Sequence, residues 1–261
     1  MRGATRMTRI IKVGGRPQAD AALPRALAAA HRQSSGGMIV VHGGGDEVSM
    51  LQALHGASAE FRDGRRVTSE LDLSIIRMAL SGSANKRLVS ALVSEGVPAI
   101  GLSGEDGALL AATPLDRATL GFVGVPEVVN VGLLQHLVAG GYLPVISPVS
   151  RSTRPDDGAT LNVNGDDAAA AIAVAIEADE LLLVSDVEGV LVSGAAVGAI
   201  GPEDAQRMID DGTAKGGMSA KLRAALVALE GGVERVRISD IAAIEDLERG
   251  TTLTRVGSMC T

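Results

Sequence analysis

The sequence predicts an α/β protein, a three-layer αβα sandwich around a largely parallel central sheet. Short β-branched runs alternate with longer Ala/Leu-rich stretches of helical period, as in parallel strands joined by crossover helices. The chain has 33 glycines, which suit many tight turns, and 46% of its residues are hydrophobic. With 261 residues it is long enough to bury a large aliphatic core.

The predicted strands are short apolar runs, most of them ending at a glycine or a polar residue. In chain order they cover 9–13, 38–41, 97–102, 143–146, 180–185 and 235–238. Their near-continuous hydrophobic character is typical of strands that are covered on both faces.

The predicted helices lie between these strands, and glycines end several of them. In chain order they cover 19–30, 47–54, 70–80, 86–95, 131–139, 166–178, 202–211 and 219–230. Ser69 and Asp72 fit a capping box at the start of the third helix. The segments 108–125 and 150–164 keep neither period and are rich in turn residues, so we expect hairpins or loops beside the main sheet.

The domain prediction is two lobes that share one continuous sheet. A new strand begins at Glu180, directly after the apolar helix that ends near Ala178, and no Pro/Ser linker separates them. We therefore expect an N-terminal lobe over 1–178 and a C-terminal lobe over 179–261.

Composition argues against several classes of protein. A net charge of −7 and the scarcity of aromatic residues (Phe61, Phe122, Tyr142) argue against a nucleic-acid surface. The longest apolar stretch, 168–176, is too short to cross a bilayer, and no signal peptide is visible. The single cysteine, Cys260, excludes an intramolecular disulfide and a Cys-based metal cluster. We expect a cytoplasmic protein.

Two glycine-rich turns follow the first two predicted strands. Lys12 lies in an apolar run before Gly14 and Gly15, where an ammonium needs an anion, so a phosphate contact and a lysine that reaches solvent from an edge strand are both open. The glycines at 43–45 present backbone amides that can bind an anion, and a plain tight turn is the alternative. We interpret His42 as a strand-end histidine with satisfied hydrogen bonds.

Three later motifs carry polar groups next to helices or strand ends. Arg65 and Arg66 precede a helix, where an arginine can grip a carboxylate or form a solvated basic turn. The run 162–166 brings two asparagines and Asp166 to the start of an almost wholly apolar helix, where they line a cleft or only cap the helix. Lys221 follows a glycine pair at a third helix start; it faces an anion or is an exposed surface lysine.

Together these motifs resemble the amino-acid kinase family, and within it the short bacterial N-acetylglutamate kinases. The resemblance covers the chain from about Ile10 to its end, and its motifs come in the family's order. They are IIKVGG, VHGGG, GRRVT, ALSGSANK, IGLSGEDG, GYLPVISP, NVNGDDAA, LLLVSDVEGV and GGMSAK.

The resemblance implies the amino-acid kinase fold and ATP-dependent phosphorylation of the side-chain carboxylate of N-acetyl-L-glutamate, in arginine biosynthesis. It implies that Lys12 and Lys221 flank the transferring phosphoryl group, that Asp166 orients both lysines, and that the amides of Gly15 and Gly44 hold that group. By the same resemblance, Gly44, Gly45, Arg66 and Asn162 bind the acyl amino acid. The implied nucleotide pocket consists of Asp186, Val187, Glu188, Gly189, Val190, Leu191, Thr213, Ala214 and Lys215.

The resemblance also implies that Mg²⁺ travels on the ATP phosphates with no dedicated metal site, that the N-terminal lobe binds the acyl amino acid and dimerises, and that the C-terminal lobe binds ATP. In the resembled family, hexameric enzymes that arginine inhibits carry an extra helix before the first strand. Only nine residues precede Ile10 here, too few and too polar for that helix, so we expect a homodimer that arginine does not inhibit. Two alternatives stay open. One is a sibling kinase for N-succinylglutamate or for carrier-protein-linked aminoadipate or glutamate; the other is a non-catalytic amino-acid or nucleotide sensor. Acyl-group choice depends on the loops around 63–66 and 150–158.

Overall fold

The structure is a computed structural model that describes residues 7–34, 37–62, 64–154, 159–192 and 194–254. The expectations for the first six residues, for Asp63, for the end of the 150–158 loop and for Cys260 lie outside these residues.

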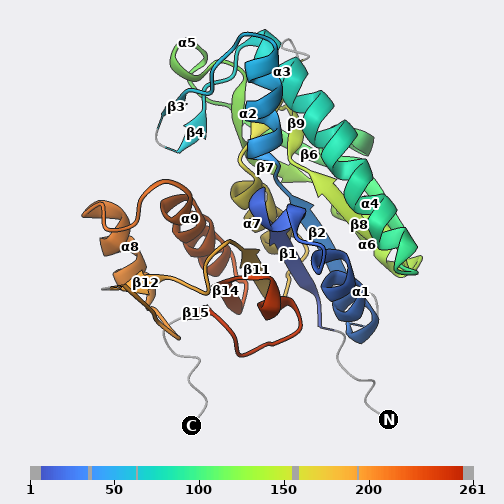
Figure 1. The fold of residues 1–261 in the computed structure, drawn as a ribbon, viewed down its shortest axis with the longest axis vertical. Helices are drawn as coiled ribbons and strands as arrows, with labels where there is room; N and C mark the ends of the chain where they lie inside the picture. The colour runs from blue at the N-terminus through green and yellow to red at the C-terminus, as the bar shows by residue number, and fades with distance from the viewer. Residues whose placement is uncertain (1–6, 35–36, 63, 155–158, 193, 255–261) are drawn as a thin grey trace.

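A seven-stranded sheet forms the centre of the fold, and β1 (Arg9–Val13) lies in its middle (Figure 1). All neighbouring strands pair in parallel except the two at one edge of the sheet, β14 and β15, which pair antiparallel. From one edge to the other the strands are β15 (Thr251–Thr254), β14 (Arg235–Ser239), β11 (Glu180–Val184), β1, β2 (Met38–His42), β8 (Leu143–Ser147) and β5 (Ala99–Ser103).

Helices cover both faces of this sheet, which confirms the three-layer prediction. Ile10 and Leu181 pack on one face against α7 (Gly165–Ala175) and α9 (Gly216–Glu230). Their chain neighbours Ile11 and Leu182 pack on the other face, because successive strand residues point to opposite sides. That second face is covered by α1 (Leu23–Gln33) and α4 (Asn85–Ser94).

The other helices lie around this core. They are α2 (Gly45–Leu54), α3 (Glu70–Ile76), α5 (Arg117–Leu120), α6 (Val131–Ala139) and α8 (Pro202–Asp210). Short turns are η1 (Arg16–Ala19), η3 (Asp106–Ala108) and η4 (Ile241–Ile244). The capping box of Ser69 and Asp72 at the start of α3 is confirmed.

The structure shifts several helix boundaries and adds a strand to the central sheet. The helix α7 ends at Ala175 and not near Ala178, and α9 begins at Gly216, three residues before the predicted start. The first helix begins at Leu23 and not at residue 19, because Asp20 is extended after a 3₁₀ turn. The third helix does not end at Leu80 but continues through the π-helical turn η2 (Arg77–Ala84) into α4. The strand β15 was not predicted; its sequence is mostly threonine and lacks an apolar run.

The two segments without a clear period form hairpins, as predicted, and the hairpins close into a small barrel. One hairpin pairs β6 (Leu110–Pro114) with β7 (Val123–Val129), and the other pairs β9 (Val149–Ser152) with β10 (Thr160–Val163). Parallel pairing of β7 with β10 and of β6 with β9 completes the ring. The closure was not predicted, because it joins strands that are distant in the sequence.

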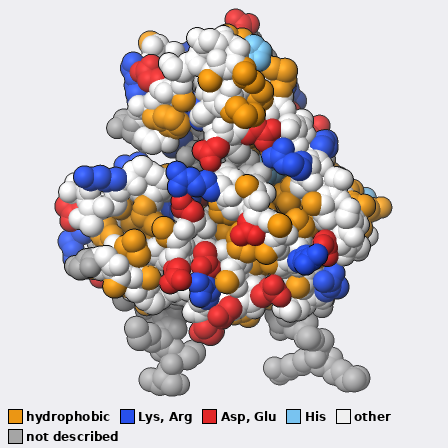
Figure 2. Space-filling view, viewed as in Figure 1, with side chains coloured by type: hydrophobic (Ala, Val, Ile, Leu, Met, Phe, Trp, Pro, Cys, Tyr) orange, Lys and Arg blue, Asp and Glu red, His pale blue; other side chains and the backbone are white. Residues whose placement is uncertain are grey.

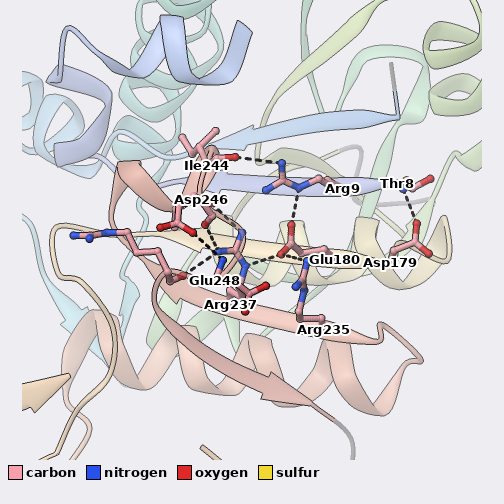
Figure 3. A network of polar contacts seen from close by, with 11 residues as sticks. Thr8, Arg9, Asp179, Glu180, Arg235, Arg237, Ile244, Asp246 and Glu248 are labelled. Carbon is pink, nitrogen blue, oxygen red and sulfur yellow. Dashed lines mark hydrogen bonds and ion pairs between the residues drawn. The ribbon is translucent and has the colours of Figure 1, made fainter. Parts of the chain in front are cut away.

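A buried charge network ties β11 to its two neighbouring strands, β1 and β14 (Figure 3). Glu180 on β11 is fully buried and pairs with Arg9 at 2.6 Å, Arg237 at 2.6 Å and Arg235 at 3.1 Å. Burial raises the pKa of Glu180, but the three arginines outweigh it and hold that pKa below its usual range. Arg237 also donates to three carbonyl groups of the segment between β14 and β15.

We expect Glu180→Gln to lower the free energy of unfolding by about 3–5 kcal/mol, because it leaves three arginine charges with no buried counter-charge. Urea denaturation measures this change. The matched control is Glu95→Gln, which removes an exposed pair with Arg25 and should cost under ~1 kcal/mol. Equal losses in the two variants would contradict the role given to the network.

Candidate active site

The carboxyl ends of β1 and β2 place the two glycine-rich turns against each other. Gly43 donates a backbone hydrogen bond to Val13 at 2.9 Å. A Cβ atom on Gly15 would lie 3.4 Å from the backbone nitrogen of Gly45, so the two turns are in close contact. Parallel sheets commonly bind ligands at this edge.

Glycine is required at position 44. Its φ is +149°, which side chains rarely allow, and a Cβ atom there would lie 2.6 Å from Cδ2 of Leu80. The next residue begins α2, whose first turn receives no side-chain cap. The backbone amides of this turn can therefore bind an anion.

Three charged side chains from three elements meet beside these turns. Lys12 Nζ on β1 lies 2.9 Å from Asp166 Oδ1 on α7, and Lys221 Nζ on α9 lies 3.4 Å from Asp166 Oδ2. Only 6%, 8% and 4% of the surfaces of Lys12, Lys221 and Asp166 are exposed. Residues far apart in the sequence thus form one buried cluster with a net charge of +1.

The electrostatics of this cluster follow from burial and from its two cations. Burial raises the pKa of Asp166, but Lys12 and Lys221 outweigh it and keep that pKa below its usual range. Burial, and then the positive charge of Lys12, lower the pKa of Lys221. An additional anion, such as a phosphate group, would relieve the repulsion between the two ammonium groups.

The asparagines of the 162–166 run combine the two functions considered for them, because both line a cavity and Asn164 also caps α7. Asn164 caps α7, because its side chain accepts a hydrogen bond from the backbone nitrogen of Asp166 at 2.8 Å. The carboxylate of Asp166 is thereby left to the lysines. Asn162 donates to Thr68 Oγ1 at 3.0 Å.

A cavity of about 390 Å³ opens from the cluster, and all of its lining residues lie between Lys12 and Asp166 in the sequence, toward the N-terminal part of the chain. Arg66 lines it from β4 (Arg65–Arg66), which pairs with β3 (Phe61–Arg62) in a separate hairpin. Its guanidinium donates to Gln52, to Gly45 O and to Ser49, all on α2. A guanidinium has five N–H donors, so it retains donors for a ligand. Gly15, Gly44, Gly45 and Asn162 also line this cavity.

A second cavity, of about 720 Å³, opens from the same cluster toward the C-terminal side. It is lined by the glycine pair at the start of α9, by Gly14 and by Arg16. Lys12, Asp166, Gly15 and Gly45 border both cavities. Figure 2 shows the surface notched between the part that carries β3 and β4 and the part that carries α8 and α9.

Two of the nucleotide residues implied by the sequence, Asp186 and Val187, line this second cavity. The other seven do not line it. Val190 and Ala214 are buried in the core, and Gly189 packs against Thr251. Glu188 pairs with Arg249, Leu191 begins the exposed hairpin of β12 (Leu191–Val192) and β13 (Ala195–Ala196), and Thr213 and Lys215 precede α9.

Comparisons with known proteins agree with this geometry. Residues 7–240 match the amino acid kinase family. The chain belongs to the amino acid kinase family. It is 44% identical to the acetylglutamate kinase of Chloroflexus aurantiacus (91% of this chain, 93% of that protein) and 42% identical to that of Geobacillus stearothermophilus (88% and 89%). The solved structure of smu.665 from Streptococcus mutans superposes with a TM-score of 0.84 at 28% identity, over 95% of this chain and 98% of that one.

Sequence reasoning missed two ion pairs of this amino acid kinase. Arg16, directly after the first glycine pair, binds Asp186 beside the second cavity. Arg65, next to Arg66, binds Asp167 on α7 at 2.8 Å. Both arginines adjoin a recognised motif, but their partners lie more than 100 residues away, so no local pattern indicates them.

His42 of this amino acid kinase is a satisfied strand-end residue, as interpreted. Its Nδ1 lies 2.8 Å from Gly43 O and its Nε2 lies 3.0 Å from Asn85 Nδ2, so the neutral ring donates to the first and accepts from the second. Burial lowers the pKa of His42 to about 4.

Within the described residues, no three His, Cys, Asp or Glu side chains gather to hold a metal ion, and no helix is long and apolar enough to span a membrane.

We expect the free energy of unfolding to fall by about 2 kcal/mol between pH 7 and pH 5 because of His42, which protonates near its ordinary pKa when unfolded but only near pH 4 when folded. His42→Gln should lose this part of the pH dependence, and the exposed His55→Gln should keep it. Urea denaturation at the two pH values measures it. The same dependence in both variants would refute the assignment.

Proposed function

We propose that this chain transfers the γ-phosphoryl group of ATP to the side-chain carboxylate of N-acetyl-L-glutamate, as a step of arginine biosynthesis. The observation that carries this proposal is the cluster of Lys12, Asp166 and Lys221, in which Lys12 and Asp166 border both cavities and Lys221 lines the larger one. The acetylglutamate kinases among its relatives, at 42–44% identity over about nine-tenths of the chain, support it.

The reaction needs alignment and charge stabilisation rather than a base. A carboxylate is ionised at pH 7, so one of its oxygens attacks the γ-phosphorus directly while the bond to the β–γ bridging oxygen breaks and ADP leaves. Lys12 and Lys221 stabilise the charge on the phosphoryl oxygens, and Asp166 holds both ammonium groups in place. The amides of Gly15 and Gly44 bind the same oxygens.

The smaller cavity takes the acyl amino acid. Arg66 binds its α-carboxylate through its charge and its remaining N–H donors, while Gly44, Gly45 and Asn162 bind the rest of the molecule. The nucleotide occupies the larger cavity, with the 186–191 turn and the 213–215 segment beside it. Mg²⁺ arrives on the ATP phosphates, because Asp166 is already neutralised by two lysines. The lobe over 1–178 thus binds the acyl amino acid and the lobe over 179–261 binds ATP.

We further propose a cytoplasmic homodimer formed through the N-terminal lobe. The edge strand β5 has no neighbour on its outer side in the described sheet, and its residues Ala99, Ile100 and Leu102 are only partly buried. Val93, near the end of α4, is 54% exposed. An open sheet edge with apolar residues is a surface that a second copy can cover.

The function is tested by an acyl-phosphate assay. The protein is incubated with MgATP, hydroxylamine and one of several acceptors: N-acetyl-L-glutamate, N-succinyl-L-glutamate, free glutamate or a carrier-protein-linked aminoadipate. We expect hydroxamate formation with N-acetyl-L-glutamate above all. Preference for another acceptor would make that acceptor the substrate instead of N-acetyl-L-glutamate. Absence of product with all of them would favour a sensor.

We expect Lys12→Ala and Lys221→Ala each to lower kcat by about 10²–10³-fold with smaller changes in KM, because each removes a preorganised charge from the transition state. Lys86→Ala is the matched control, since Lys86 is exposed on α4 and lines neither cavity. Steady-state kinetics with both substrates measures the effect. Turnover near that of the unmodified enzyme in either lysine variant would remove that lysine from the mechanism.

We expect static light scattering to give the mass of a dimer, and Ile100→Glu to give that of a monomer, because a charge would be buried at the open edge. A monomer before substitution would contradict the proposal, and so would a dimer that is unchanged by it.

A further inference from the structure

An ion pair that the proposed reaction does not use joins the β3–β4 hairpin to the helix of the catalytic aspartate. Arg65 Nη2 lies 2.8 Å from Asp167 Oδ2, and the side chains are 25% and 19% exposed. Asp167 directly follows Asp166 on α7, and Arg65 directly precedes Arg66 on β4. Each partner is thus the chain neighbour of a residue assigned to substrate binding or to catalysis.

The two arginines of β4 are anchored on two different helices that line the smaller cavity. Successive strand residues point to opposite sides. Arg66 bonds to Gln52 and Ser49 on α2, and Arg65 bonds to Asp167 on α7. The first turns of α2 and α7 both line this cavity. The strand β4 therefore connects α2 to α7 through two side chains.

Partial burial makes the Arg65–Asp167 pair sensitive to the loss of either partner. Burial raises the pKa of Asp167, Arg65 opposes this effect, and the negative charge of Asp166 adds to it. Without Arg65, the carboxyl group would have to move toward water or take up a proton. In either case the contact between β4 and α7 would loosen.

We propose that the Arg65–Asp167 pair sets the distance between the carboxylate grip of Arg66 and the phosphoryl-transfer centre at Asp166, and so selects acceptors with the side-chain length of glutamate. This inference rests on the proposed function. Arg65 and Asp167 are positioning residues, since Asp167 acts through the helix that carries Asp166 and Arg65 acts through Asp167.

We call the distance from Arg66 to the phosphoryl-transfer centre at Asp166 the span. Its length matters because both ends of the acceptor are held. Its α-carboxylate is bound at Arg66, and its side-chain carboxylate must meet the γ-phosphorus in line. A misplacement of about 1 Å can cost roughly 10²-fold in rate. A rigid span therefore rejects an acceptor that is one methylene longer, whereas a loosened span aligns the correct acceptor less well and rejects the longer one less.

The experiment compares kcat/KM for N-acetyl-L-glutamate and for N-acetyl-L-2-aminoadipate, which is one methylene longer. Arg65→Met, Asp167→Asn and the double variant are measured with Arg65→Lys, which keeps the charge. Arg62→Met is the matched control, since Arg62 pairs with Glu60 on the exposed side of the same hairpin. Amide hydrogen exchange at Val67, which donates to Glu60 O at the base of the hairpin, is measured without substrates.

We expect Arg65→Met and Asp167→Asn each to lower the glutamate-over-aminoadipate ratio by roughly tenfold, the size of effect that one methylene commonly carries. Most of this loss should fall on kcat for N-acetyl-L-glutamate. The double variant should match the single variants, Arg65→Lys should retain most of the ratio, and Arg62→Met should not change it. Exchange at Val67 should accelerate in the variants that break the pair and not in Arg62→Met.

An unchanged ratio in an active Arg65→Met or Asp167→Asn enzyme would overturn the inference, as would additive losses in the double variant. Lower thermal stability with an unchanged ratio would give the pair only a structural role. Absence of activity on N-acetyl-L-glutamate in the unmodified protein would instead refute the proposed function. In that event the exchange rates at Val67 still decide whether the pair holds the hairpin.

Discussion

The fold brings two ammonium groups together where little of either side chain is exposed, and the carboxylate of Asp166 makes this possible. Lys12 and Lys221 would repel each other and lose hydration without it, yet one carboxylate only half neutralises them. The remaining positive charge matches a phosphoryl group. This arrangement requires β1, α7 and α9 to converge, and they do so because α7 and α9 pack on the same face of β1 and β11, the face to which Lys12 points.

Much of the fold follows from local sequence patterns. The six predicted strands are all present because apolar runs such as 9–13 and 180–184 fit only the middle of a covered sheet. Features that depend on distant pairing do not follow in the same way. The strand β15 is polar and is held by β14, the barrel joins β6 to β9, and η2 is a π-helical turn packed between two helices.

The same distinction between local patterns and distant partners holds for the residues of the candidate site. Lys12, Asp166 and Lys221 were found in the sequence because each stands beside glycines or at the start of an apolar helix. The partner of Arg65 was not, because Asp167 comes beside it only in three dimensions. The implied nucleotide residues after Val187 follow a family motif, and the structure places several of them in the core or on the exposed hairpin. Their roles stay a prediction.

The most direct test of the central claim is a crystal structure with ADP, Mg²⁺, N-acetyl-L-glutamate and aluminium fluoride, which mimics the phosphoryl group in flight. The account predicts a planar fluoride between the two cavities, with Lys12 Nζ and Lys221 Nζ both about 3 Å from its fluorine atoms and Asp166 still between the two ammonium groups. A planar group that neither lysine reaches, or one bound away from Asp166, would contradict it.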